Sequence, residues 1–294
     1  MTKSIYWKYP EHIVQAEWLK NEIDNEKIRI FDCTTYLHYT DNDPSKPYIV
    51  ESGFEDYKNS HIPGASFLDL QKDLSNNKSA YRFTLPNWSD LAQCFMKLGI
   101  GEPFNIILYS RNGLQWSTRV WWMLYTLGFN NVSVLDGGLI EWQRLGYLTE
   151  KGIRKYNSAS FKSNPKNDIF VYKEKVLSKI GNKSCIILNA LTEDIHLGLN
   201  PRYGRLGRIP GSLNIPFHDL VNTKSGKLKQ PSDALKIFKD KGFKKNHEII
   251  NYCGGGIAAT LDAFVLLQLG YYKIKIYDNS MSEWAMDKSL PIET

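Results

Sequence analysis

The 294-residue chain contains the same series of landmarks twice, and this internal repeat restricts its fold more than any other feature. In the first half an apolar stretch ends at Asp32, and the segment His61-Ile62-Pro63-Gly64-Ala65 follows it. In the second half a similar stretch ends at Asn189 and is followed by Arg208-Ile209-Pro210-Gly211-Ser212. Two copies with one order of landmarks indicate one fold that is used twice.

The spacing inside the two copies also agrees. A further apolar stretch ends at Ser110 in the first copy and at Cys253 in the second, and a Leu-Gly pair closes the helix-like stretch after each of them. An aspartate and then a tryptophan follow at equal distances, as Asp136 and Trp142 and as Asp278 and Trp284. Strands that alternate with helices predict an α/β protein with two tandem domains, each a mainly parallel sheet with helices on both faces.

The segment between the two copies sets the expected domain limits. Residues 151–167 are polar and show no hydrophobic period, so we expect them to link a first domain of residues 1–150 to a second of residues 168–294. A hydrophobic fraction of 42% is enough to fill two cores. No apolar run reaches the roughly 18 residues that span a bilayer, and no signal peptide is recognisable, so we expect a cytoplasmic protein without a membrane partner.

Charge and cysteine content narrow the possible partners. The net charge of +6 is modest and its lysines are dispersed, which argues against nucleic-acid binding and mildly favours small anions. The cysteines are scattered, without the spacing of a zinc site or a disulfide framework, so we expect neither metal nor disulfide. They are Cys33, Cys94, Cys185 and Cys253.

Only Cys253 lies in a sequence that favours a reactive thiol. It follows an apolar strand and precedes three glycines and an alanine-rich helix. Glycines allow the backbone to turn its N–H groups inward, and the helix adds the positive end of its dipole, so the loop favours a thiolate nucleophile. The first copy has Ser110 at this position, which predicts a catalytically silent domain. We interpret the other three cysteines as core residues.

These landmarks resemble those of the tandem rhodanese-like sulfurtransferases, the family of thiosulfate and 3-mercaptopyruvate sulfurtransferases. The resemblance covers nearly the whole chain, and the order and duplication of its motifs make it specific. Its motifs are His61-Ile62-Pro63-Gly64-Ala65, Arg119-Val120-Trp121-Trp122, Val134-Leu135-Asp136-Gly137-Gly138, Ile209-Pro210-Gly211, Tyr252-Cys253-Gly254-Gly255-Gly256, and Tyr277-Asp278 through Glu283-Trp284.

The resemblance implies an enzyme without a cofactor. Cys253 would take a sulfane sulfur from a small anionic donor, become a persulfide, and pass the sulfur to a thiophilic acceptor such as cyanide or a thiol, with a thioredoxin-like protein among the candidates. We expect a monomer. Backbone N–H groups would hold the persulfide anion without adding a competing nucleophile. They belong to Gly254, Gly255, Gly256, Ile257 and Ala258.

The chain also departs from the family pattern in its loop. Thiosulfate-preferring members usually carry basic residues after the cysteine, and mercaptopyruvate-preferring members usually carry a serine where this chain has Gly255. The histidine that often precedes a Leu-Pro pair is replaced in Phe83-Thr84-Leu85-Pro86. Because no basic residue follows Cys253, the sequence slightly favours 3-mercaptopyruvate over thiosulfate.

Three arginines upstream of the loop are candidates for anion binding. Guanidinium groups recognise carboxylate or sulfonate in a bidentate manner, and we assign this role first to Arg202 and then to Arg205. Arg208 and Asn189 stand where the first copy has His61 and Asp32. We therefore predict one structural hydrogen bond in each domain, between His61 and Asp32 in the first and between Arg208 and Asn189 in the second. For Arg119 we favour packing between the domains.

Two other functions fit parts of the pattern. A cysteine-dependent phosphatase has a similar strand, loop and helix, but it needs an arginine at the position that Ala259 occupies here. A non-catalytic rhodanese-like binding module would have an absent or occluded thiol in both copies, which Cys253 argues against. A sulfurtransferase therefore remains the favoured function.

Overall fold

The computed structural model describes residues 5–40, 43, 46–166 and 168–294. Its strands form two five-stranded sheets, both parallel throughout, so the expected fold class is confirmed. The strands of one sheet lie between residues 13 and 135 and those of the other between 170 and 277. Asn167, the last residue of the expected linker, and residues 1–4 lie outside the described part of the chain.

The two sheets have the same strand order. The first is arranged as β1-β7-β6-β2-β5 and the second as β8-β12-β11-β9-β10, so each strand has a counterpart in the other sheet. The first contains β1 (Ile13–Val14), β2 (Ile28–Asp32), β5 (Ser66–Phe67), β6 (Asn105–Tyr109) and β7 (Val132–Leu135). The second contains β8 (Phe170–Val171), β9 (Cys185–Asn189), β10 (Leu213–Asn214), β11 (Glu248–Tyr252) and β12 (Ile274–Tyr277).

Helices cover these sheets, and the longest two meet between them. The first half holds α1 (Ala16–Asn21), α2 (Phe54–Asn59), α3 (Trp88–Lys97), α4 (Gln115–Thr126) and α5 (Gly138–Arg144). The second half holds α6 (Lys173–Leu177), α7 (Glu193–His196), α8 (Pro231–Asp240), α9 (Ala258–Gln268) and α10 (Ser280–Trp284), and short 3-10 helices span Pro10–His12 and Phe217–Leu220. No helix in these described ranges is long and apolar enough to cross a membrane.

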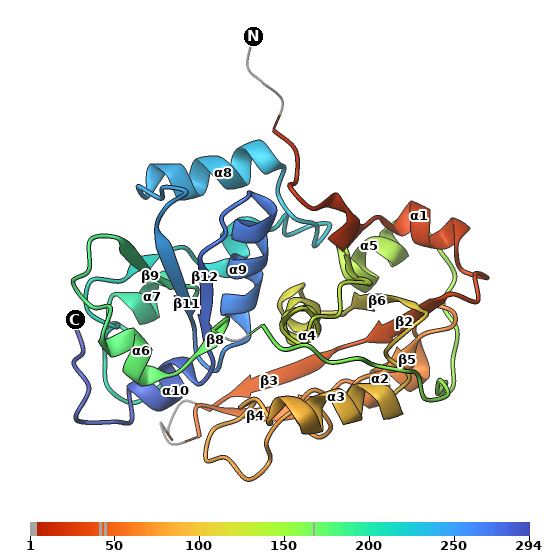
Figure 1. Ribbon diagram of the computed structural model, residues 1–294, viewed down its shortest axis with the longest axis horizontal. Helices are drawn as coiled ribbons and strands as arrows, with labels where there is room; N and C mark the ends of the chain where they lie inside the picture. The colour runs from red at the N-terminus through yellow and green to blue at the C-terminus, as the bar shows by residue number, and fades with distance from the viewer. Residues whose placement is uncertain (1–4, 41–42, 44–45, 167) are drawn as a thin grey trace.

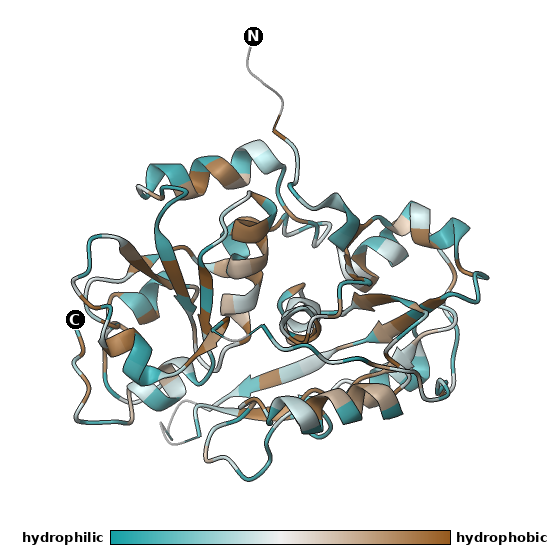
Figure 2. Cartoon of the chain, viewed as in Figure 1, coloured by the Kyte–Doolittle hydropathy of each residue, from teal (hydrophilic) through white to brown (hydrophobic). Residues whose placement is uncertain are grey.

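Helices α4 and α9 pack against each other at the centre of the molecule (Figure 1). The hydroxyl groups of Thr118 and Thr260, at equivalent positions of the repeat, lie 2.9 Å apart. Trp121 packs edge-on against Phe264 with ring centroids 4.9 Å apart. Every residue of α9 after Ala258 is buried, and Figure 2 shows its apolar character beside the mixed surface of α8. One hydrophobic core therefore continues from one half of the molecule into the other.

The expected linker is packed, not free. Residues 151–166 form no helix or strand. The Tyr156 hydroxyl donates a hydrogen bond to the Gly64 carbonyl at 2.7 Å, and Phe161 is buried against Phe95 and Phe129. This segment therefore adds to the first half of the molecule, and the domain limits at residues 150 and 168 remain a prediction.

One element has no counterpart in the second half and was not anticipated. Strands β3 (Thr35–Tyr39) and β4 (Tyr48–Ser52) pair with each other as an antiparallel ribbon, from Thr35 opposite Ser52 to Tyr39 opposite Tyr48. The ribbon leaves the first sheet and runs toward the second half of the molecule (Figure 1). It carries Tyr39 and Tyr48 toward the Cys253 loop.

Candidate active site

The Cys253 loop joins β11 to α9 at the carboxyl end of the second sheet. Ligand sites of open parallel sheets lie at this end, so the strand order places the thiol where a site is expected. The Cys253 side chain is 2% exposed. The loop runs from Cys253 to Ile257, and the helix begins at Ala258.

Three carbonyl groups of the loop, those of Cys253, Gly254 and Gly256, accept hydrogen bonds from neighbouring elements. The Cys253 and Gly254 carbonyls accept hydrogen bonds from the N–H groups of Met281 and Ser282, at 3.0 and 2.8 Å. The Gly256 carbonyl accepts one from Arg119 Nη1 at 3.1 Å. Because the two ends of a peptide unit point in opposite directions, these bonds direct the loop N–H groups away from α10.

The Cys253 N–H group donates a hydrogen bond to Ser280 Oγ at 3.0 Å, whereas the N–H groups that follow it are without acceptors in the described structure. Within the described residues, none of the N–H groups from Gly254 to Ile257 donates a hydrogen bond. Free inward amides followed by a helix N-terminus form a site for an anion. The loop can therefore hold a thiolate or a persulfide, which is the role proposed from the sequence for Gly254, Gly255, Gly256, Ile257 and Ala258.

Each glycine of the loop is required by close neighbours. Gly256 has a φ of +72°, and a Cβ atom there would collide with the Asp278 carbonyl. A Cβ atom at Gly254 would collide with the hydroxyl group of Tyr203, and one at Gly255 would lie 2.7 Å from the hydroxyl group of Tyr48. Glycine is required at position 256 by the backbone conformation, and at positions 254 and 255 by tyrosines from elsewhere in the chain.

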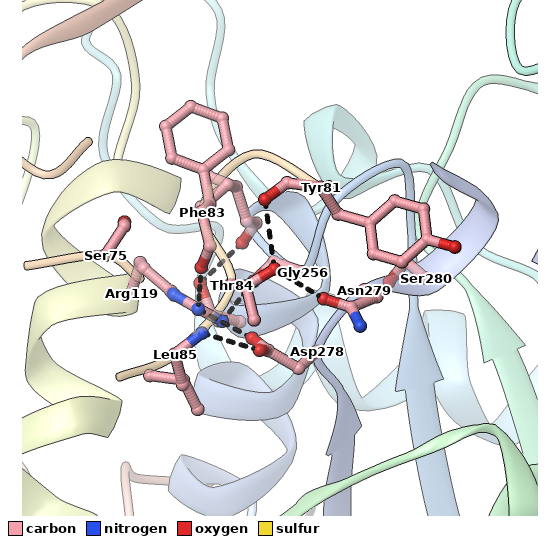
Figure 3. A network of polar contacts seen from close by, with 12 residues as sticks. Ser75, Tyr81, Phe83, Thr84, Leu85, Arg119, Gly256, Asp278, Asn279 and Ser280 are labelled. Atoms are coloured by element: carbon pink, nitrogen blue, oxygen red, sulfur yellow. Dashed lines mark hydrogen bonds and ion pairs between the residues drawn. The ribbon is translucent and has the colours of Figure 1, made fainter. Parts of the chain in front are cut away.

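Residues of the first half of the molecule hold the loop through hydrogen bonds and an ion pair. Arg119 on α4 is fully buried and reaches across the interface, where Nη2 contacts Asp278 Oδ1 at 2.6 Å and the Phe83 carbonyl at 2.7 Å (Figure 3). The other Asp278 oxygen accepts a hydrogen bond from the Leu85 N–H group at 2.8 Å. Arg119 thus ties both Asp278 and the Gly256 carbonyl to the first half, in agreement with the expected role between the domains.

Three tyrosines gather at the loop, and the sequence did not single them out. Tyr39 and Tyr48 face each other at the end of the β3–β4 ribbon where the chain passes from β3 to β4, and Tyr203 lies in the segment between α7 and β10. Burial raises the pKa of each of these phenols, and the nearby Cys253 sulfur raises it further. Of these three tyrosines, Tyr48 lines a cavity of about 530 Å³, together with Arg82, Ser282 and other residues.

The candidate arginines have different surroundings. The Arg202 guanidinium stacks on the Tyr39 ring at 3.8 Å from its centroid and makes no hydrogen bond or ion pair among the described residues. Arg205 instead donates hydrogen bonds of 2.7–2.9 Å to the carbonyls of Trp284, Ala285, Asp287 and Leu290. Since its donors hold the C-terminal segment, the contacts of Arg205 do not support a role in substrate binding.

The prediction that Arg208 bonds to Asn189 and His61 to Asp32 is wrong. His61 contacts Glu150 at 3.2 Å and Arg208 forms an ion pair with Glu293, so neither uses the residue that ends the preceding strand. In each half the same glutamate also accepts a hydrogen bond at 2.7 Å from a glycine of the Pro-Gly turn. A short antiparallel bridge places both glutamates, and sequence spacing alone could not reveal it.

The Ser110 loop of the first half is occupied by contacts with its own residues and with Thr34. Ser110 Oγ donates a hydrogen bond to the Gly113 carbonyl, and the Arg111 N–H group donates to Thr34 Oγ1 at 3.0 Å. The Gln115 side chain fills the space above Gly113. Serine also lacks an accessible anion near neutral pH, so these contacts agree with a silent site.

Of the remaining cysteines, Cys33 is buried in the core, and Cys94 and Cys185 are partly buried against it. Burial raises the pKa of Cys33, and it raises the pKa of both Cys94 and Cys185 to about 11. Thiols in such surroundings are poor nucleophiles.

Known proteins share this architecture. A family model described as the rhodanese-like domain matches residues 15–145 and 192–287. The chain is 32% identical over 289 residues to the 3-mercaptopyruvate sulfurtransferase of Escherichia coli (strain K12), covering 95% of this chain and 97% of that protein. It is 27% identical over 282 residues to the thiosulfate sulfurtransferase of Rattus norvegicus, covering 92% and 91%. The crystal structure of SseA from Escherichia coli, described as a 3-mercaptopyruvate sulfotransferase with a rhodanese fold, superposes with a TM-score of 0.77 at 30% identity, covering 92% of this chain and 98% of that one.

Proposed function

This chain belongs to the rhodanese-like domain family, and from that premise we propose that it is a sulfurtransferase that carries sulfur as a persulfide on Cys253. The observation that carries the proposal is a single thiol followed by a loop in which the N–H groups from Gly254 to Ile257 have no acceptor among the described residues. A cytoplasmic, monomeric enzyme without a cofactor is the form that we propose.

The first step transfers sulfur to the enzyme. The Cys253 thiolate attacks the sulfur of 3-mercaptopyruvate, the new S–S bond forms as the C–S bond breaks, and the electron pair of that bond stays on the three-carbon fragment as an enolate. The proton of the donor thiol moves to this fragment, so that pyruvate leaves and a persulfide anion remains. The loop amides stabilise the negative charge that resides on sulfur before and after this step.

The second step returns the thiolate. Cyanide or an acceptor thiolate attacks the outer sulfur of the persulfide, the S–S bond breaks, and its electron pair returns to the Cys253 sulfur. Cyanide leaves as thiocyanate and a thiolate leaves as its own persulfide. A thioredoxin-like protein is a candidate acceptor because it presents an exposed thiolate of low pKa.

The surroundings of the loop favour 3-mercaptopyruvate as donor. Thiosulfate carries two negative charges, and a buried dianion needs cationic side chains close to it. The loop itself has only glycine and apolar side chains from residues 254 to 259, and Arg202 is the guanidinium that stacks beside the tyrosines. One guanidinium fits the single carboxylate of 3-mercaptopyruvate better.

A mass measurement tests the proposal directly. The reduced protein is mixed with 3-mercaptopyruvate or with thiosulfate, and the intact mass is then recorded. We expect a gain of one sulfur atom, larger with 3-mercaptopyruvate, that cyanide removes and that is absent in Cys253→Ser. Failure of both donors to add sulfur to the folded wild-type protein would show that the proposed function is wrong.

Phosphatase chemistry is the second candidate, and the loop argues against it. The position of the phosphate-binding arginine is occupied by Ala259, which is fully buried. No other guanidinium donates a hydrogen bond into the loop from the described residues except Arg119, which binds the Gly256 carbonyl.

A further inference from the structure

Two hydroxyl groups occupy the space above the loop where side chains of residues 254 and 255 would otherwise lie. For Gly255 the Tyr48 hydroxyl lies 2.7 Å from the Cβ position, while the next nearest atoms are 3.8 Å away. For Gly254 the Tyr203 hydroxyl is the nearest atom, close enough to exclude any Cβ. The glycines and the tyrosines therefore form a matched set, in which hydroxyl groups from elsewhere replace side chains of the loop.

The two tyrosines reach the loop from opposite halves of the molecule. Tyr48 begins β4, where its ring stacks on Phe83 with centroids 6.2 Å apart and meets Tyr39 edge-on at 6.4 Å. Tyr203 is 4% exposed and belongs to the second half. Both rings are held by packing, so neither hydroxyl group is free to leave the loop without disturbing the interface.

Both hydroxyl groups are hydrogen-bond donors under physiological conditions. Burial is the main cause that raises the pKa of Tyr48 and of Tyr203, so the phenols stay protonated. No hydrogen bond from Tyr203 Oη is found within the described residues. Beside Tyr48 lies the buried hydroxyl group of Ser282, which interacts with the Tyr48 hydroxyl group. The site thus holds a buried hydroxyl group, that of Tyr203, which the described chain leaves without a partner, and this is a feature of ligand sites.

The cavity of about 530 Å³ is lined by Tyr48, whose hydroxyl group also approaches Gly255, and by Ser282. Its size is within the range of small-molecule sites, and a three-carbon keto acid would fill only part of it. Tyr48 therefore lies between this cavity and the loop, in which the Cys253 thiol is 2% exposed.

We propose that Tyr48 and Tyr203 contact the sulfur donor, and that their hydroxyl groups donate hydrogen bonds to the anionic sulfur and to the enolate that leaves it. This inference rests on the proposed function and names two further residues of that site. The backbone amides stabilise the charge from one side and the two phenols from the other. Arg202, which stacks on Tyr39, and Arg82, which lines the cavity with Tyr48, add positive charge, which suits an anionic thiol keto acid.

Conservative variants test this assignment. Tyr48→Phe and Tyr203→Phe each keep the packed ring and remove only the hydroxyl group. Loss of one donor to a developing anion lowers kcat by about 10- to 100-fold, and we expect a KM change of less than about threefold. The matched control is Tyr36→Phe on β3, because the Tyr36 hydroxyl binds Asp56 on the exposed side of the ribbon.

A hydroxyl transplant provides the sharper test. Gly255→Ser alone should lose activity, because its Cβ lies 2.7 Å from the Tyr48 hydroxyl. Combined with Tyr48→Phe, the new serine hydroxyl occupies the vacated space, and kcat should rise at least fivefold above that of Tyr48→Phe. A double variant no faster than Tyr48→Phe would contradict the role of the hydroxyl group.

The outcomes separate this inference from the function on which it rests. If wild-type protein forms the Cys253 persulfide while both phenylalanine variants keep kcat within twofold of it, the tyrosine assignment is wrong and the function stands. If the wild-type protein forms no persulfide with either donor, the proposed function fails first. Melting temperatures of the variants, expected within a few degrees of wild type, show that losses in rate do not come from unfolding.

Discussion

In the first half of the molecule β6 ends at Ser110, and in the second half its counterpart β11 ends at Cys253. Both loops lie at the same end of sheets with the same strand order. In the first loop, Ser110 Oγ donates a hydrogen bond to the Gly113 carbonyl, the Arg111 N–H group donates to Thr34 on the segment after β2, and the Gln115 side chain fills the space above Gly113. In the second loop the N–H groups from Gly254 to Ile257 have no acceptor among the described residues, and hydroxyl groups from two other segments approach the glycines. The comparison shows that one fold can surround the same loop with a side chain of the loop's own helix or with hydroxyl groups from distant segments.

One pair of contacts between the halves is also repeated. Leu85 N–H donates to Asp278 in the second half, and Leu228 N–H donates to Asp136 in the first, both at 2.8 Å. Only Asp278 has an arginine partner, since Arg119 on α4 corresponds to an apolar leucine on α9. The Cys253 loop is therefore the one that carries the buried ion pair beneath it.

The largest expected effect comes from exchanging the two loop residues. Cys253→Ser should remove sulfur transfer completely. Adding Ser110→Cys to it should not restore transfer, because the Arg111 N–H group is already bonded to Thr34 and the Gln115 side chain fills the space above Gly113. Thiocyanate formation and intact mass measure both variants. A persulfide on residue 110 in the double variant would show that the two loops are chemically equivalent after all.

Breaking the asymmetric ion pair should have the next largest effect. Arg119→Met leaves the Asp278 carboxylate buried without its partner, which costs about 3–5 kcal/mol of the free energy of unfolding. The matched variant in the first half is Asp136→Asn, which should cost only about 1 kcal/mol because this carboxyl group has no arginine. Urea unfolding measures both, and equal losses would mean that the two contacts are equivalent.

An effect of intermediate size is expected in the pH dependence of stability, where His196 of the second half differs from Asp32 of the first. Burial, followed by the charge of Arg208, lowers the pKa of His196 to about 4, and Asn189 Nδ2 donates to its Nδ1 at 3.2 Å. At the position equivalent to Asn189, burial raises the pKa of Asp32. The two domains therefore respond to acid in opposite directions at this point of the fold.

The sign for His196 follows from the two states. Below pH 6.5 the unfolded chain binds a proton on this ring that the folded chain excludes until about pH 4, so its contribution to stability is complete above pH 6.5 and is lost as the pH falls toward 4. When the pH is lowered from 7 to 5, we expect the free energy of unfolding of the wild type to fall by about 2 kcal/mol through this group. The variant His196→Gln should not show this loss. Identical urea midpoints for the two proteins at pH 5, after matching at pH 7, would contradict it.

The smallest effect concerns the arginines beside the Cys253 loop. Arg202→Ala removes a guanidinium without hydrogen bonds in the described structure, so stability should stay nearly constant while the KM for 3-mercaptopyruvate rises about tenfold. Arg205→Ala should behave in the opposite way, with lower stability and an unchanged KM, because its four hydrogen bonds hold the C-terminal segment. A KM that responds to Arg205 and not to Arg202 would reverse the assignment.

Much of this arrangement could be predicted from local signals. The Asp136 and Asp278 landmarks correctly predicted a repeat, and the strand before Cys253 and the helix after its glycines are both present. Trp142 and Trp284 even repeat their contacts, since each indole N–H donates to a carbonyl further along the chain at 2.8 and 2.7 Å. The β3–β4 ribbon escaped prediction because its strands pair only with each other and have no equivalent in the second copy.

The sequence by itself determined the repeated α/β fold and the position of the one thiol with a glycine loop, because both depend on hydrophobic period and backbone freedom over short distances. Only the tertiary structure decided what surrounds that thiol. Gly254 and Gly255 look in the sequence like missing donor-binding side chains, and the folded chain shows tyrosine hydroxyls in their place. Tyr48 precedes Gly255 by about two hundred residues, and contacts over such separations arise from packing, which no local pattern records.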